Sequence, residues 1–409
     1  MSSRIEAPRG TLDALPAQSA ARDLVLRTTA EVAAVYGYGT IVTPTFEATE
    51  LFQRTAGVGS DVVSKEMYTF EDRGNRSLTL RPEGTAGVAR AYVEHGLHKR
   101  PQPVKTWYAG PMFRYAAPQK GRYREFWQVG FEAMGSNDPG LDVELIRLFV
   151  EIVNRLGLTG VRLELNSIGD RQCRPAYVEQ LQGFLADHRS ELDDDARAKA
   201  AVSPLRVFDT KSPRVAELLA AAPTIGGSLC ADCAAHFAEV RAVLDAMGVA
   251  YDLKPTLVRG LDYYTRTVWE FVNDDLDAAQ STVCAGGRYD YLIEEIGGQP
   301  TPGSGWAAGI ERLALSLGDV EAQAEADVFL AVDDPARRTE ALVALAALRS
   351  VGLRAETDYA GRSLKGQLTQ AQRLRARTTV IVRADGVTVR RRGADDIVVE
   401  TIQEAVEQL

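Results

Sequence analysis

The chain has 409 residues, more than one hydrophobic core usually sustains, so two or three domains are expected. Its 45% hydrophobic and 25% charged residues are typical of a soluble globular protein, and no apolar run suits a membrane span or an N-terminal signal peptide, so a cytoplasmic location is expected. The net charge of -9 excludes a general attraction to nucleic acid, so RNA binding would need a local basic patch.

The first part of the chain predicts one long helix followed by short strands. Apolar residues recur at helical spacing over residues 15–36, and glycines 37 and 39 end this helix before a strand at 40–43 and a proline at 44. Further strands are expected at 77–80, 104–109 and 125–133, with no helix-like spacing between the last two. This order favours an α+β fold with an antiparallel sheet over a doubly wound parallel sheet.

The remainder of the chain changes character twice. Residues 171–250 are charged and alanine-rich and predict a helical insertion, including helices at 191–199 and 231–247. Strand-like, glycine-rich sequence resumes at 251 and is followed by a helix at 311–317 and a polar linker at 318–325. We therefore expect one core made of residues 1–170 and 251–320, an insertion at 171–250, and a small α/β domain at 326–409, where strands and helices alternate.

Cys230, Cys233 and His236 have the residue types and close spacing of metal ligands, but they form only half of a site. A structural zinc ion needs four ligands, and the other cysteines, Cys173 and Cys284, stand in unrelated sequence contexts. We therefore expect a reduced pair packed against a helix, with no bound metal. A disulfide framework is not expected from four cysteines in a chain of this length.

Two segments place arginines where a phosphate group could bind. Arg114 and Arg122 lie in and beside a polar, basic loop between two expected strands, and guanidinium groups pair well with phosphate oxygens. Arg312 stands at the start of a helix, directly after the small residues of 305–309. The alternatives are a solvated hairpin and a surface ion pair of Arg312. No P-loop pattern or dinucleotide fingerprint is present.

Residues 257–270 have the sequence Leu-Val-Arg-Gly-Leu-Asp-Tyr-Tyr-Thr-Arg-Thr-Val-Trp-Glu. The β-branched and aromatic residues from 265 to 271 favour a strand, and Gly260 allows a bend that can bring Arg259 over a pocket. Tyr263 and Tyr264 would then contact a small ligand. The alternative is a buried aromatic strand.

The order Arg-Gly-Leu-Asp-Tyr-Tyr-x-Arg-Thr-Val strongly resembles the histidine-binding loop of histidyl-tRNA synthetases, and three further segments resemble that family in the same order. Residues 15–44 resemble motif 1 of the class II synthetases, 113–128 motif 2, and 305–313 motif 3. The resemblance implies an antiparallel catalytic sheet flanked by helices, a homodimer formed through motif 1, and an anticodon-binding domain at 326–409. One departure is Ala116, where the family usually carries an acid.

The resemblance also implies a role for each candidate residue. The catalytic side chains, which would stabilise charge on the reacting phosphate, are Arg259, Arg114 and Arg312. ATP would be bound by Arg114, Arg122 and Arg312. Histidine would be bound by Glu83, Gly84, Thr85, Arg114, Gln128, Glu132, Arg259, Tyr263, Tyr264 and Tyr289. The tRNA would be contacted by Gln119 at its acceptor end and, in the anticodon-binding domain, by Arg390, Arg391 and Arg392.

The reaction implied by the resemblance joins L-histidine to ATP with the help of Mg²⁺, releases pyrophosphate, and transfers histidine from the adenylate to the 3′ end of the histidine tRNA. None of the four histidines lies in a proposed motif, which disfavours a histidine-dependent triad. Two alternatives stay open: a non-catalytic relative, such as the regulatory subunit of ATP phosphoribosyltransferase, and a class II enzyme for another amino acid. The retained Arg114, Arg259 and Arg312 oppose the first, and the two-tyrosine loop opposes the second.

Residues 362–392 carry nine basic side chains and a single acid, Asp385. This run is the local basic patch that an acidic protein needs in order to bind RNA. The alternative is a solvated arginine-rich surface, because no aromatic residue is interleaved with these charges to stack on a base. The family resemblance favours the RNA-binding interpretation.

Overall fold

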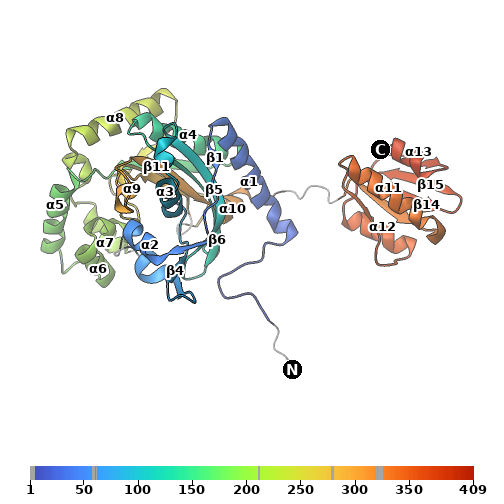
Figure 1. Ribbon diagram of the computed structural model, residues 1–409, viewed down its shortest axis with the longest axis horizontal. Coiled ribbons are helices and arrows are strands. Elements are labelled where there is room, and N and C mark those ends of the chain that lie inside the picture. Colours follow the sequence, from blue (N-terminus) through green and yellow to red (C-terminus); the bar gives the residue numbers. More distant parts are fainter. Residues whose placement is uncertain are drawn as a thin grey trace. The chain divides into compact units, whose positions relative to one another are not determined.

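The computed structural model describes residues 5–57, 60, 62–210, 212–277, 281–318, 320 and 326–409. The chain divides into two units, Met1–Val320 and Glu321–Leu409 (Figure 1). Each unit has its own hydrophobic core. Most of the expected linker, namely residues 319 and 321–325, lies outside the described residues.

A large, mostly antiparallel sheet forms the centre of the first unit, which confirms the α+β prediction (Figure 1). Its order is β1-β5-β6-β11-β10-β9-β7-β8, and of these neighbours only β1 with β5 and β7 with β8 run parallel. The strands are β1 (Gly39–Thr40), β5 (Val104–Phe113), β6 (Glu125–Met134), β7 (Val161–Ser167), β8 (Asp252–Leu253), β9 (Thr265–Asn273), β10 (Thr282–Arg288) and β11 (Gly303–Gly309).

Four helices bury one face of this sheet. They are α1 (Pro16–Val35), α4 (Pro139–Leu156), α8 (Ala231–Ala246) and α10 (Ile310–Leu317). Helix α4 begins after Asp138, whose side chain accepts a hydrogen bond from the backbone of Gly140, and ends at Gly157 with a left-handed φ of 68°. Side chains alternate along β6, so Phe131 packs into this core while Glu132 points to the opposite face.

The opposite face carries a small sheet and short helices. The sheet has the order β2-β4-β3, with β2 (Phe46–Ala48), β3 (Tyr68–Glu71) and β4 (Ser77–Leu80). The helices are α2 (Thr49–Ala56), α3 (Thr85–Glu94) and α9 (Leu292–Glu295). The strand expected at 40–43 ends at Thr40 instead, because the Thr43 carbonyl accepts from the Arg81 guanidinium at 3.0 Å and Pro44 has no N–H for a ladder.

The insertion is helical, with α5 (Arg174–Asp187), α6 (Asp194–Val202) and α7 (Pro213–Leu219) before α8. The helix expected at 191–199 starts later, because Asp193 caps α6 by accepting from the backbone N–H of Ala196 at 2.8 Å. Shorter helical turns in the chain are Val62–Glu66, Leu97–Lys99, Pro204–Asp209, Ile225–Ser228 and Pro335–Arg337.

The second unit is built on a five-stranded mixed sheet of order β13-β12-β14-β15-β16. Its strands are β12 (Val328–Val332), β13 (Ala355–Thr357), β14 (Thr378–Arg383), β15 (Gly386–Arg391) and β16 (Ile397–Val399), and its helices are α11 (Arg338–Ser350), α12 (Leu364–Arg373) and α13 (Ile402–Glu407). Strands and helices alternate as predicted as far as β14. In neither unit does a described helix combine the length and apolar character needed to cross a membrane.

Candidate active site

A cavity of about 320 Å³ opens between β6, β10 and β11, the β5–β6 hairpin and the loop that precedes β9. Segments far apart in the sequence therefore contribute to one site. Of the predicted site residues, the cavity is lined by Glu83, Thr85, Arg114, Arg122, Gln128, Arg259, Tyr263, Tyr264 and Arg312.

Arg114, Arg122 and Arg312 are close enough to one another to influence each other's charge. Burial lowers the pKa of Arg312, and the positive charges of Arg114 and Arg122 lower it further. Arg312 is held by the carbonyl of Thr282, which accepts from Nη1 at 2.6 Å, and Arg122 donates to Glu66 Oε1 at 2.8 Å. Guanidinium groups stay protonated in proteins, so this cluster favours an anion with several oxygens between them.

Arg259 lies on the same cavity and forms an ion pair with Glu270 of β9. The other carboxylate oxygen of Glu270 accepts from the hydroxyl of Thr282 at 3.0 Å, which fixes the acid in place. Nε of Arg259 is buried and has no hydrogen-bond partner among the described residues. Because buried donors are normally paired, this free N–H marks a position for a ligand acceptor.

Glu83 supplies negative charge where β4 leads into α3. Its two carboxylate oxygens accept from the backbone N–H groups of Thr85 at 2.6 Å and Ala86 at 2.8 Å, so the acid caps α3. Burial raises the pKa of Glu83, although these hydrogen bonds oppose the shift. Gly84 is required for packing, because a Cβ at this position would collide with the ring of Tyr108.

Glu132 and Tyr289, both predicted to bind histidine, lie behind the lining side chains instead of among them. Glu132 is fully buried, accepts from the hydroxyl of Thr85 at 2.6 Å, and also accepts from the hydroxyl of Tyr289. Burial raises the pKa of Glu132 to about 8. Gly305 leaves the space for this carboxylate, since a Cβ there would overlap it. The pair therefore positions Thr85 from behind.

Two further buried polar atoms lack a hydrogen-bond partner among the described residues, Gln128 Oε1 and the hydroxyl of Tyr108. Gln128 lines the cavity directly. Tyr263 and Tyr264 cover the same region, with ring centroids 4.6 Å apart. The cavity therefore offers an amide, an acid and aromatic rings beside the arginines, and the Arg259 guanidinium lies 5.8 Å from the centroid of the Tyr264 ring.

Sequence reasoning missed Glu270, Glu66 and Tyr108. Glu270 could have been noticed, because it is an acid in a strand made mostly of β-branched and aromatic residues. Nothing in the local pattern distinguishes Glu66 or Tyr108. Their partners, Arg122 and Gly84, come from other segments of the chain.

The residues predicted to contact tRNA lie outside the cavity. Gln119 is exposed at the tip of the β5–β6 hairpin, where its N–H donates to the Arg122 carbonyl at 3.1 Å. Arg390 pairs with Asp396 at 2.7 Å. Arg390 and Arg391 are consecutive residues of β15, so they point to opposite faces of that sheet and do not form one surface.

The basic run of the second unit is partly neutralised. Acids outside residues 362–392 form ion pairs with four of its arginines: Asp358 with Arg362, Asp327 with Arg377, Asp333 with Arg383, and Asp396 with Arg390. Counting acids within the run alone therefore overstated its charge. In the described structure, ion-pair partners are lacking for Lys365, Arg373, Arg375, Arg391 and Arg392.

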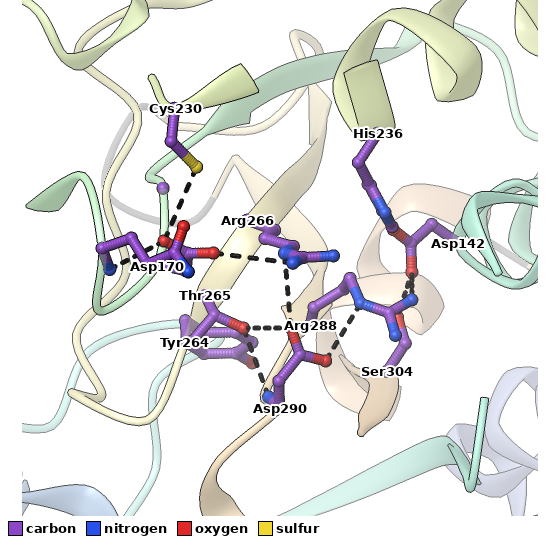
Figure 2. A network of polar contacts seen from close by, with 12 residues as sticks. Asp142, Asp170, Cys230, His236, Tyr264, Thr265, Arg266, Arg288, Asp290 and Ser304 are labelled. Carbon is purple, nitrogen blue, oxygen red and sulfur yellow. Dashed lines mark hydrogen bonds and ion pairs between the residues drawn. The ribbon is translucent and has the colours of Figure 1, made fainter. Parts of the chain in front are cut away.

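The prediction that Cys173 is unrelated to Cys230 and Cys233 is wrong. The three Sγ atoms and a carboxylate oxygen of Asp170 all lie within 4.8 Å of one another. His236 takes no part in this cluster, because its Nε2 forms a hydrogen bond of 2.8 Å with Asp142 Oδ2, as Figure 2 shows. Cys284 is separate and lines the cavity.

Comparison with known proteins agrees with the geometry. The family model described as histidyl-tRNA synthetase matches residues 10–313. The histidine–tRNA ligase of Moorella thermoacetica is 48% identical over 380 residues, which cover 92% of this chain and 89% of that protein. The ligase of Desulforamulus reducens is 47% identical over 382 residues, with 92% and 90% covered.

Solved structures give the same result. Apo histidyl-tRNA synthetase of S. aureus aligns with a TM-score of 0.83 and 35% identity, covering 99% of both chains. A Bacillus halodurans protein described as an ATP phosphoribosyltransferase regulatory subunit/histidyl-tRNA synthetase shares the fold, with a TM-score of 0.68 and 24% identity over 93% of this chain and 99% of its own. The family model matches most of this chain, and the relatives align with it over nearly their whole length. This chain therefore belongs to the histidyl-tRNA synthetase family.

Proposed function

We infer that this chain activates L-histidine with ATP and transfers it to the 3′ end of the histidine tRNA. The observation that carries this conclusion is one cavity in which clustered arginines lie beside a buried acid, an amide and two tyrosines. The relatives named histidine–tRNA ligase support histidine over other amino acids, and their number and coverage do not favour the non-catalytic alternative.

ATP binding is assigned to Arg114, Arg122 and Arg312. A triphosphate carries several negative oxygens, and placing it among these guanidinium groups relieves the repulsion that lowers the pKa of Arg312. A carboxylate oxygen of histidine would attack the α-phosphorus of ATP, the bond from that phosphorus to the bridging oxygen of the leaving group would break, and pyrophosphate would depart. Arg114, Arg259 and Arg312 would stabilise the charge that accumulates on the phosphate oxygens.

Histidine binding is assigned to the acid, the amide and the two tyrosines that line the cavity beside the arginines. Glu83 matches the α-ammonium group in charge, Gln128 has an unpaired acceptor, and Tyr263 and Tyr264 cover the imidazole ring. Glu132 would act through Thr85 and Tyr289, which it holds by hydrogen bonds. In the second step, a ribose hydroxyl of the tRNA end would attack the adenylate carbonyl and release AMP, with Gln119 at the entrance.

Mg²⁺ accompanies ATP in the proposed reaction, but the described cavity does not provide a dedicated site for it. Two acids line the cavity. Glu83 accepts one backbone N–H group on each carboxylate oxygen, and both oxygens of Glu311 accept from the backbone N–H of Trp127. Both oxygens of the neighbouring Glu270 are likewise engaged. Mg²⁺ usually binds substrate phosphates and water with only one or two protein ligands. We assign it no protein ligand and no step of the protein's chemistry.

We propose a homodimer because apolar side chains after β1 are exposed. Val42 is 89% exposed, and Phe46 and Phe70 are exposed neighbours with ring centroids 6.3 Å apart. Such a group of exposed apolar side chains marks an interaction surface. Val42 lies within the segment that resembles motif 1, and Phe46 follows that segment. We also propose a cytoplasmic location, because that is where ribosomes use charged tRNA.

The proposed function is tested by amino-acid-dependent exchange of labelled pyrophosphate into ATP, run separately with each of the twenty amino acids. We expect exchange with histidine alone. Exchange with a different amino acid would assign the chain another substrate. No exchange at all, together with retained binding of histidine or ATP, would support a non-catalytic role.

A further inference from the structure

Away from the cavity, four side chains with metal-ligand chemistry meet where the helical insertion joins the core: Asp170, Cys173, Cys230 and Cys233. One oxygen and three sulfur atoms lie within 4.8 Å of one another. Asp170 and Cys230 are separated by 60 positions in the sequence, so the fold brings two distant segments together. The cluster contains three of the four cysteines of the chain, and each of them is a free thiol.

The backbone around Asp170 is shaped to bring two of these ligands together. Gly169 has a φ of +63°, and a Cβ there would lie only 2.6 Å from Cys173 Sγ, so no other residue fits without displacement. The carboxylate of Asp170 accepts from the backbone N–H of Gln172 at 2.9 Å, which folds the turn. Cys173 then precedes the first residue of α5.

The second pair comes from the start of α8. Cys230 precedes the first residue of this helix and Cys233 lies in its first turn, so both face the same point. Figure 2 shows the Sγ of Cys230 directed at the carboxylate of Asp170.

The distances suit a tetrahedral metal ion. Ligands at about 2.3 Å from zinc form a tetrahedron with edges of roughly 3.8 Å. Asp170 Oδ1 lies 3.6 Å from Cys173 Sγ and 3.9 Å from Cys230 Sγ. Three sulfur ligands select a thiophilic cation such as Zn²⁺ over Mg²⁺ or Ca²⁺.

Asp170, the one ligand of the four that is not a cysteine, also contacts a positively charged side chain. The second oxygen of Asp170 lies 3.5 Å from Nη2 of Arg266, as the dashed line in Figure 2 shows, and metal-bound carboxylates commonly have such a partner. Arg266 itself adopts a φ of 48°, which is rare for a residue with a side chain. Its N–H donates to the Gly169 carbonyl at 2.7 Å, which ties the turn to β9.

We propose that Asp170, Cys173, Cys230 and Cys233 bind one structural Zn²⁺ ion, which fastens helices α5 and α8 of the insertion to the core. As the ion binds, three sulfur–zinc bonds form and each thiol releases its proton. This proposal replaces the expectation that the Cys-x-x-Cys pair binds no metal. In the proposed site, the other two metal ligands beside Cys230 and Cys233 are Cys173 and Asp170, and His236 is not a ligand.

The site also supports the tyrosine loop of the cavity. Arg174 directly follows Cys173, and its Nη2 donates to the Tyr264 carbonyl at 2.6 Å. Its Nε donates to the Ile168 carbonyl at 3.2 Å, on the same turn as the metal ligands. Zinc at this position therefore holds Arg174 where it supports the backbone of Tyr264.

The first test is elemental analysis of the full-length chain, purified under reducing conditions from cells supplied with zinc. We expect about one zinc per chain. Cys173→Ser and Cys230→Ser should each lose the metal or bind it more than about tenfold more weakly, since loss of an outer partner alone costs that much. The matched controls are His236→Gln, which tests the ligand set suggested by sequence spacing, and Cys284→Ser, which removes the remaining cysteine. Both controls should keep zinc.

The second test uses the unmodified chain and so does not depend on variants that fold. Zinc is removed with a zinc-selective chelator and replaced by Co²⁺, whose absorption should show sulfur-to-cobalt charge transfer and tetrahedral bands. Removal should lower the Tm, and added zinc should restore it. Neither measurement requires synthetase activity, so its failure is distinguishable from failure of the proposed function.

Three outcomes would overturn the proposal. The first is a reduced protein that contains no zinc and gives no tetrahedral cobalt spectrum. The second is a protein that keeps its zinc in Cys173→Ser but loses it in His236→Gln, which would show that the proposed ligand set is wrong. The third is a Cys230–Cys233 disulfide in freshly purified protein that, once reduced, does not take up metal.

Discussion

Arg259 lines the cavity and forms an ion pair with Glu270. In the proposed reaction, Arg259→Ala removes a donor that acts mainly when negative charge accumulates on the phosphate. We expect kcat for histidine-dependent pyrophosphate exchange to fall by about a hundredfold or more.

Steady-state kinetics of Arg259→Ala checks this prediction. The control is Arg155→Ala, which removes an arginine from the exposed side of α4, where it forms an ion pair with Glu151. The control should match the unmodified chain. If kcat of Arg259→Ala is also unchanged, Arg259 has no catalytic role.

Glu132 provides a pH-dependent prediction at the same scale. Burial raises its pKa from 4.5 to about 8, so between these values the folded chain holds a proton that the unfolded chain has lost. Stability therefore declines as the pH rises from about 4.5 to about 8, and the full penalty is present above that range.

Glu132→Gln, which is neutral and similar in shape, should remove this penalty. Relative to the unmodified chain, we expect its free energy of unfolding to increase with pH over the same range, by up to a few kcal/mol, and then level off. Urea unfolding at a series of pH values measures the difference. A difference that does not vary with pH would show that Glu132 is ionised in the folded chain. Thr85→Val, which removes a partner but no charge, provides the comparison.

At the scale of elements, the two units have separate hydrophobic cores. All the described residues that line the cavity belong to the first unit. A chain that ends after residue 325 should therefore retain most of its pyrophosphate exchange but charge tRNA far more slowly. Assaying both activities on the same preparation checks this, with the full-length chain as control. Equal loss of the two activities would contradict a separate RNA-binding role.

The arginines at the end of β15 refine the RNA-binding prediction. Arg390 is already paired with Asp396, whereas Arg391 and Arg392 lack ion-pair partners in the described structure. Replacing Arg391 and Arg392 by Ala should weaken tRNA binding and make its dependence on salt shallower by about one or two units of the logarithmic slope. Arg390→Ala is the matched control and should have the smaller effect. Identical slopes in all three proteins would exclude this strand end as a tRNA contact.

At the scale of the whole molecule, the exposed apolar residues after β1 predict a two-fold symmetric dimer. Light scattering at micromolar concentration should give twice the chain mass of 44.5 kDa. Val42→Asp places a charge in the proposed interface and should shift the protein toward the monomer. Val343→Asp alters a valine that is 67% exposed on the other unit and should leave the mass unchanged. A monomeric unmodified chain would contradict the prediction.

The sequence by itself determined the local elements and the family. Helical spacing over residues 15–36 predicted α1 to within one residue at each end, because an amphipathic period is a local property. The two-tyrosine loop, the arginine hairpin and the small residues before Arg312 indicated the family, because such short segments can be compared directly with those of known proteins.

Only the tertiary structure decided which distant residues meet. In the fold, Cys173 lies beside Cys230 and Cys233. His236 forms a hydrogen bond with Asp142 instead of joining the cysteines, and Glu132 accepts a hydrogen bond from Thr85. The fold also supplied acids from other segments to the arginines of the second unit, as Asp396 does for Arg390. These pairings depend on how the insertion and the sheets bring segments that are distant in the sequence into contact. A linear pattern records the period and chemistry of each segment but does not specify which of many compatible partners will pack against it.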